Sequence, residues 1–115
     1  MIHYKQRVSF EKRKEESTRI LDKYKERIPI IVSKCTRCDL PEIDKEKYLV
    51  PKDMSLGQFV YVIRKRIKLD PNQALFTLVN NTLQTSCKHI EEIYNKQKDQ
   101  DGFLYIHYSS ENTFG

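Results

Sequence analysis

The segment Lys45–Ile67, KEKYLVPKDMSLGQFVYVIRKRI, contains a predicted strand followed directly by a predicted helix. Lys47–Pro51 has the β-branched and aromatic content of a strand. Pro51 gives no backbone donor, and charged residues crowd the start of the segment, which is typical of a strand at the edge of a sheet. An edge strand can accept a further strand. We therefore place the candidate function in this segment.

The predicted helix begins after Ser55, because Ser55 and Gln58 have the spacing of a capping box. Apolar residues then recur at helical spacing on one face: Leu56, Phe59, Val60, Ile63 and Ile67. This stripe predicts a helix packed on the sheet. Beside it, Phe59, Val62 and Arg66 form a flank. On periodicity alone, Val62 is best interpreted as an ordinary, partly exposed valine.

Length and composition fit one compact domain. The chain has 115 residues and no segment rich in Pro, Gly or Ser. Its longest apolar run, Ile28–Val32, is far shorter than the roughly 18 residues of a membrane span, and the N-terminus is too charged for a secretory signal. We therefore expect a soluble polypeptide. The formal net charge of +5 favours acidic peptides, lipid headgroups or nucleic acid as partners without choosing among them.

The other segments predict an α+β fold. Ser9 can cap a helix from Phe10 to about Tyr24, with Phe10, Ser17, Leu21 and Tyr24 on one face and Glu16 and Ile20 on its flank. Consecutive apolar residues predict strands covered on both faces at Ile28–Lys34 and Phe103–Tyr108, which we expect to pair in parallel at the centre of the sheet. The first of these strands also forms a hairpin with Lys47–Pro51 through a long loop.

A second hairpin is predicted by Asn80-Asn81, since asparagine tolerates the positive φ of a two-residue turn. Its strands are Leu75–Val79 and Thr82–Gln84. A short helix follows from the spacing of Ile90, Ile93 and Tyr94.

Metal and redox chemistry have little support. Three cysteines without a signal sequence favour a reducing compartment and free thiols. Cys35 and Cys38 form a CxxC that Cys87 and His89 could extend to a Cys3His zinc site, but the second half lacks the usual spacing. A thioredoxin-like role is weaker still, because the CxxC follows a strand instead of opening a helix.

No catalytic constellation is present, so we predict neither an enzyme nor a cofactor or metal site. His3, His89 and His107 are scattered, and three glycines form no phosphate-binding loop. The basic cluster Arg64–Arg66 with Lys68 could touch nucleic acid, but a solvated helix face is at least as good an interpretation.

The order of elements and a set of short strings together resemble the autophagy ubiquitin-like modifiers, the family of GABARAP and the microtubule-associated light-chain-three proteins. The strings span the whole chain: Phe10-Glu11-Lys12-Arg13, Lys23-Tyr24, Arg27–Val32, Lys47–Pro51, Gly57-Gln58-Phe59, Ile63–Ile67, Leu78–Asn81, Phe103–Ile106 and Phe114-Gly115. The resemblance implies a ubiquitin-like β-grasp fold in a single domain, with an N-terminal helical segment (1–27), a β-grasp core (28–109) and a flexible tail (110–115).

The resemblance also implies that a peptide with an aromatic-x-x-aliphatic motif adds as a strand to the edge at residues 47–50. The aromatic pocket it implies comprises Glu16, Ile20, Pro29, Ile31, Lys47, Leu49 and Phe103. The aliphatic pocket it implies comprises Tyr48, Val50, Pro51, Met54, Phe59, Val62 and Arg66. Arg27 and Lys45 with Lys47 would attract acids that precede the motif, and Glu46 opposes that attraction.

By the same resemblance, Gly115 is conjugated to phosphatidylethanolamine on autophagic membranes. The implied partners are cargo receptors and adaptors, E1-like and E2-like conjugating enzymes, a cysteine protease, the membrane and tubulin, but not nucleic acid. The expected location is the cytoplasm, and the autophagosome membrane after lipidation. The alternative is a trafficking or microtubule-associated adaptor that is not conjugated. Lys25, the CxxC and Gln84-Thr85 depart from the family pattern and bear on which partners are shared.

Overall fold

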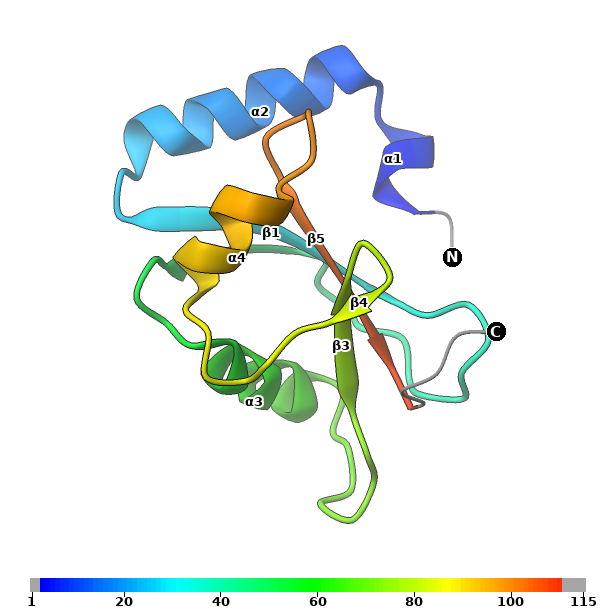
Figure 1. Ribbon diagram of the computed structural model, residues 1–115. Coiled ribbons are helices and arrows are strands. Elements are labelled where there is room, and N and C mark those ends of the chain that lie inside the picture. Colours follow the sequence, from blue (N-terminus) through cyan, green and yellow to red (C-terminus); the bar gives the residue numbers. More distant parts are fainter. Residues whose placement is uncertain (1–2, 111–115) are drawn as a thin grey trace.

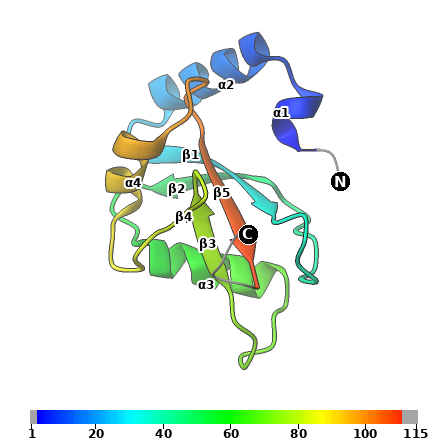
Figure 2. The same cartoon turned by 45° about the vertical axis from the view of Figure 1, so that its right-hand side comes forward.

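A five-stranded mixed sheet carries helices on both faces (Figures 1 and 2). The computed structural model describes residues 3–110. The helices are α1 (Tyr4–Arg7), α2 (Phe10–Lys23), α3 (Leu56–Arg66) and α4 (Ile90–Gln97). The strands are β1 (Arg27–Lys34), β2 (Lys47–Pro51), β3 (Phe76–Val79), β4 (Thr82–Leu83) and β5 (Leu104–Ser109), in the sheet order β2-β1-β5-β3-β4.

The centre of the sheet is the parallel pair β1 and β5, in which Ile30 lies opposite Leu104. β2 pairs antiparallel with β1 at one edge, and β3 pairs antiparallel with β5 on the other side. In the turn between β3 and β4, Asn80 and Asn81 have φ values of 52° and 62°. The predicted parallel centre, both hairpins and the edge position of β2 are therefore confirmed.

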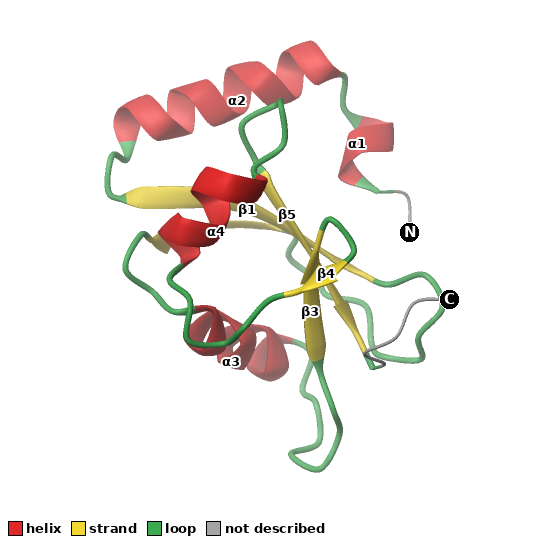
Figure 3. Ribbon diagram, in the orientation of Figure 1, coloured by secondary structure: helices red, strands yellow, loops and turns green. Residues whose placement is uncertain are grey.

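Helices cover both faces of the sheet (Figure 3). The two faces bury different side chains. On the α3 and α4 side lies the main core, which includes Ile28, Ile30, Val32, Phe59, Ile63, Ile90, Ile93, Leu104 and Ile106. On the α1 and α2 side, a smaller cluster comprises Tyr4, Ile31 and Phe103 with Val8, Ile20 and Tyr105 packed against it. Because β1 is buried on both faces, its continuous apolar run is explained.

α3 begins with the predicted capping box. The backbone N–H of Gln58 donates to Ser55 Oγ at 3.1 Å, and the N–H of Ser55 donates to Gln58 Oε1 at 2.9 Å. The predicted stripe faces the core, where four of its members are buried: Leu56, Phe59, Ile63 and Ile67. This helix was predictable because its capping box and its apolar stripe both indicate the same helix.

α2 buries only part of its predicted stripe: Ser17 is buried and Leu21 packs against the core. Phe10 and Tyr24 are 45% and 39% exposed, so the stripe predicted between them reaches solvent at both ends. The buried residues of α2 are Arg13 and Ser17. Both residues contact the loop before β5, as described below.

α1 is absent from the sequence prediction, because four residues are too few for periodicity. His3 caps it, and Tyr4 is only 4% exposed. The predicted bounds of β3, β4 and β5 each differ by one residue from those observed. Within residues 3–110, no helix has the length and apolar character needed to cross a membrane.

Candidate peptide-binding edge

β2 presents an open hydrogen-bonding edge. The N–H of Val32 donates to the C=O of Glu46 at 2.8 Å, which fixes the phase of the β1–β2 ladder. Because antiparallel pairs alternate between bonded and non-bonded positions, the backbone groups of Lys47 and Leu49 point away from β1. No strand within residues 3–110 pairs with that side of β2. These groups can bond an added strand, and Pro51 ends the row of donors.

On the α2 side, the odd-numbered side chains of β2 lie over an apolar floor. Lys47 and Leu49 lie opposite Ile31 and Pro29 of β1. Ile31 packs with Phe103, and both are buried, whereas Leu49 is 36% exposed. The residues that the resemblance assigns to the aromatic pocket thus gather here: Glu16, Ile20, Pro29, Ile31, Lys47, Leu49 and Phe103.

Glu16 of α2 is held at this site by two donors. The hydroxyl of Tyr4 donates to Oε1 at 2.5 Å, and Lys47 Nζ donates to Oε2 at 2.8 Å. Burial acts to raise the pKa of Glu16, but the bonds from Lys47 and Tyr4 outweigh it and the pKa is lowered. Glu16 is therefore an ionised acceptor, and each of its oxygens keeps a lone pair for another donor.

Tyr4 is a site residue that sequence reasoning missed. Its ring meets Phe103 edge-on with centroids 5.7 Å apart, and Lys47 Nζ lies 5.1 Å from its centroid. Tyr4 therefore completes the wall between α1, α2 and β2. The available signal was an aromatic residue alone beside the charged run Lys5–Arg7.

On the α3 side, the even-numbered side chains of β2 meet the main core. The ring of Tyr48 lies edge-on to Phe59 at 5.5 Å, and Val50 is 5% exposed. Val62 stays 37% exposed on the flank of α3. The residues assigned by resemblance to the aliphatic pocket lie around this point: Tyr48, Val50, Pro51, Met54, Phe59, Val62 and Arg66.

Two polar features border this side. Arg66 Nε donates to Asp44 Oδ1 at 2.8 Å at the surface, and this bond lowers the pKa of Asp44. The hydroxyl of Tyr48 is buried and has no hydrogen-bond partner among the described residues. Burial raises the pKa of Tyr48 to about 12, so this hydroxyl stays protonated.

Cations lie beside the start and the middle of β2. Arg27 Nη1 donates to the C=O of Leu49 at 3.2 Å, and Lys45 Nζ lies 5.0 Å from the centroid of the Tyr48 ring. The charge of Glu46, which opposes an acidic peptide, is engaged by Arg7. The rim can therefore attract acids despite Glu46.

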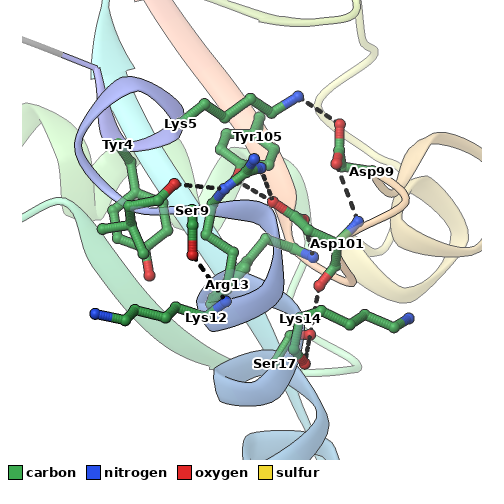
Figure 4. A network of polar contacts seen from close by, with 12 residues as sticks. Tyr4, Lys5, Ser9, Lys12, Arg13, Lys14, Ser17, Asp99, Asp101 and Tyr105 are labelled. Carbon is green, nitrogen blue, oxygen red and sulfur yellow. Dashed lines mark hydrogen bonds and ion pairs between the residues drawn. The ribbon is translucent and has the colours of Figure 1, made fainter.

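A buried polar network fixes α2, and with it the wall that carries Glu16 (Figure 4). Arg13 Nη1 donates to Asp101 Oδ2 at 2.6 Å, and Tyr105 donates to the same oxygen at 2.5 Å. The hydroxyl of Ser17 donates to the backbone C=O of Asp101 at 2.5 Å. These bonds hold the polar side chains of Arg13 and Ser17 against the loop before β5.

The other candidate sites do not come together. Cys35, Cys38 and Cys87 are unpaired, and the described residues contain no group of three side chains placed to hold a metal ion. In the basic cluster, Lys65 lies over the exposed ring of Tyr61 at 4.8 Å. Gly115, the predicted conjugation residue, lies outside the described residues.

The site therefore has two sides, one on each face of the sheet and both at the same edge. Successive side chains of a strand point to opposite faces, so residues at i and i+3 of an added strand also point to opposite faces. An extended peptide with anchors at this spacing would direct one anchor toward α2 and the other toward α3.

Comparison with known proteins identifies relatives of this chain. A family model described as "Autophagy protein Atg8 ubiquitin like" matches residues 12–115. Autophagy-related protein 8 of Saccharomyces cerevisiae is 57% identical over 112 residues, which cover 97% of this chain and 96% of the yeast protein. Autophagy-related protein 8A of rice, Oryza sativa, is 58% identical over 105 residues, covering 91% of this chain and 88% of the rice protein.

Solved structures show the same similarity. The crystal structure of Trypanosoma brucei ATG8 matches with a TM-score of 0.91 and 43% identity, covering 100% of this chain and 99% of that one. Plasmodium falciparum Atg8, solved in complex with an Atg3 peptide, also gives a TM-score of 0.91, with 34% identity over 99% of this chain and 100% of that one. The predicted ubiquitin-like fold is confirmed, and this chain belongs to the Atg8 family of ubiquitin-like autophagy proteins.

Proposed function

We propose that this chain is a non-enzymatic modifier that captures motif-bearing peptides at β2 and is conjugated through Gly115 to phosphatidylethanolamine. In this role it joins cargo receptors and adaptors to autophagic membranes, and it moves between cytoplasm and autophagosome membrane. It acts as a single ubiquitin-like domain over residues 1–115, whose last five residues lie outside the described part.

The observation that carries the peptide-binding proposal is the open edge of β2 between two sides of different character. The backbone of Lys47 and Leu49 supports strand addition, which supplies affinity without regard to sequence. The α2 side combines an apolar floor with the ionised acceptor Glu16, which suits a ring that carries an N–H donor. The α3 side is apolar, with Val62 at its opening, which suits an aliphatic anchor.

The test is an NMR titration of the 15N-labelled chain with an acidic peptide containing Trp-x-x-Leu. We expect shift changes centred on Ile20, Leu49, Val50, Phe59 and Val62. The matched control is the same peptide with both anchors changed to alanine, which keeps its charge and length. Equal shifts with both peptides, or none at high concentration, would contradict capture through the two pockets.

The conjugation proposal has separate support, because the family match runs through residue 115. Glycine suits a tail that must expose its carboxylate in a narrow enzyme channel, since it has no side chain. An Atg3-type conjugating enzyme is a proposed partner, because the Plasmodium relative was solved with an Atg3 peptide. An E1-like enzyme, a cysteine protease and tubulin are further partners proposed from the family resemblance.

Reconstitution with E1-like and E2-like enzymes, ATP and phosphatidylethanolamine vesicles tests this step by mass spectrometry. The unmodified chain should gain one lipid, and Gly115→Ala should gain none while still binding the Trp-x-x-Leu peptide. Persistence of the adduct in Gly115→Ala would rule out conjugation at this residue. Peptide binding by an unmodified chain that gains no lipid would instead favour the unconjugated trafficking adaptor.

A further inference from the structure

A cavity of about 420 Å³ lies beneath α1, next to the α2 side of the peptide-binding edge, with which it shares Tyr4 and Ile31. Its lining includes His3 and Lys5 at α1, Ser33 on β1, Glu42 in the connection to β2, Asp99 after α4, and His107 on β5. None of these residues takes part in the proposed capture of a peptide. They lie instead between α1 and the sheet.

Two of the three histidines of the chain meet in this cavity. His107 Nδ1 lies 2.8 Å from Ser33 Oγ on the neighbouring strand. The ring of His3, at the N-cap of α1, lies edge-on to that of His107, with centroids 6.1 Å apart and planes at 90°. Two neutral imidazoles can pack in this way, whereas two imidazolium ions would repel each other at this separation.

The charged groups facing the cavity are already balanced. Each acidic side chain in its described lining has a cationic partner, and the pairs are Lys5–Asp99 at 2.5 Å, Lys34–Glu42 at 3.9 Å, and Arg7–Glu46. Burial acts to raise the pKa of Asp99, but the bonds from Lys5 and from its own loop outweigh it and leave the pKa lowered. A proton added to either histidine therefore meets no unpaired acid in the described lining.

We propose that His3 and His107 form an acid-sensitive latch, in which neutral rings allow α1 to close on the sheet and protonated rings release it. α1 connects to α2 through Val8 and Ser9, which have extended backbone and belong to neither helix, so rotation about them would let α1 lift. The ion pairs of Lys5 and Arg7 hold α1 at neutral pH, and the imidazolium pair opposes them in acid.

The sign of this effect follows from linkage. Burial is the main cause that lowers the pKa of His107 in the docked state, and His3 and Lys5 lower it further. Once α1 lifts, the ring is exposed and its pKa returns toward about 6.5. The released state binds more protons, so the equilibrium constant for docking of α1 falls as pH drops below about 6.5. For one histidine it falls by up to about tenfold at pH 5.5.

Release of α1 would also change the peptide-binding edge, and this consequence rests on the proposed function. Tyr4 leaves with α1, so Glu16 loses its hydroxyl donor and Phe103 loses its edge-on contact with the ring of Tyr4. Acid should therefore weaken binding at the α2 side and leave the α3 side unchanged.

NMR of the 15N,13C-labelled chain from pH 7.5 to 5.0 tests the latch without any peptide. We expect the Overhauser contacts between the rings of Tyr4 and Phe103 to weaken with pH, and the backbone of α1 to gain mobility in its heteronuclear NOE. The shifts of core methyls such as those of Ile30 and Ile106 should stay constant, which separates release of α1 from unfolding.

The decisive variant is His3→Gln with His107→Gln, in which α1 should stay docked at pH 5.0. Its matched control is His89→Gln, which removes the third histidine, at the N-cap of α4, and should keep the acid response. If the double variant does not fold, His3→Gln alone should reduce the response. Docking that is unchanged to pH 5.0 in the unmodified chain, or lost equally in the glutamine variants, would overturn the latch. Neither result bears on peptide capture at pH 7.5, so the two proposals fail separately.

Discussion

Arg13 on α2 and Asp101 in the loop before β5 form an ion pair of 2.6 Å between residues 88 positions apart, with the carboxylate wholly buried. The same loop turns at Gly102, whose φ of 92° favours glycine. A Cβ at Gly102 would lie 2.3 Å from Ser17 Oγ, so α2 and this loop are in close contact. The helix wall of the peptide-binding edge is therefore positioned by polar contacts.

Arg13→Met should destabilise the chain by about 3 kcal/mol, because it leaves the buried carboxylate of Asp101 without its cation. Urea unfolding followed by circular dichroism measures the loss. The control is Arg66→Met, which breaks the exposed pair with Asp44 and should leave the unfolding midpoint unchanged. Equal midpoints for Arg13→Met and the unmodified chain would show that the buried pair does not hold α2.

This ion pair also shows which kind of contact could not be predicted from the sequence. The capping box of α3, the asparagine turn and the edge at Pro51 depend on neighbouring residues, and all were predictable. The burial of Arg13 depends on Asp101, a distant residue in a loop, which no helical periodicity can reveal. Of the stripe predicted for this helix, Ser17 is buried, but Phe10 is 45% exposed.

The candidate site was likewise predicted only in part. Strand alternation and helical spacing predicted β2 and α3, whereas the family resemblance assigned their residues to the two pockets. The pocket role of Val62 came from the family resemblance, since its spacing alone suggested an ordinary surface valine. Tyr4 and its bond to Glu16 were missed because α1 is one turn long and its contact is tertiary.

Tyr48→Phe should raise the free energy of unfolding by about 1 kcal/mol, because it removes a buried hydroxyl without a described partner. Tyr108→Phe is the matched comparison. Its hydroxyl donates to the C=O of Pro41 at 2.6 Å, so the same deletion should lower the free energy of unfolding by about 1 kcal/mol. Urea unfolding of both variants measures the difference, and a loss of stability in Tyr48→Phe would indicate a hydrogen bond to bound water.

Lys47→Met should raise the pKa of Glu16, because it removes the donor that contributes most to lowering it. With a lowered pKa, Glu16 stabilises the fold above about pH 4.3, and this contribution is lost as pH falls through the folded-state pKa. The variant should therefore lose less stability between pH 5 and pH 3.

Carboxyl 13C NMR of Glu16 follows its titration directly. Lys52→Met is the control, because Lys52 pairs with Glu91 at 3.7 Å and has no bond to Glu16. An unchanged Glu16 titration in Lys47→Met would assign the lowered pKa to Tyr4 instead.

Val62→Asp should weaken binding of the acidic Trp-x-x-Leu peptide at least about tenfold, since it places a charge where an aliphatic anchor would be desolvated. Tyr61→Asp adds the same charge one residue earlier, about 100° away around α3, at a side chain that is 57% exposed. Calorimetric titration of both variants separates the two effects. If both weaken binding equally, general repulsion of an acidic peptide explains the loss. If only Val62→Asp weakens binding, the flank of α3 is a binding surface, and peptide binding explains why a valine is exposed there.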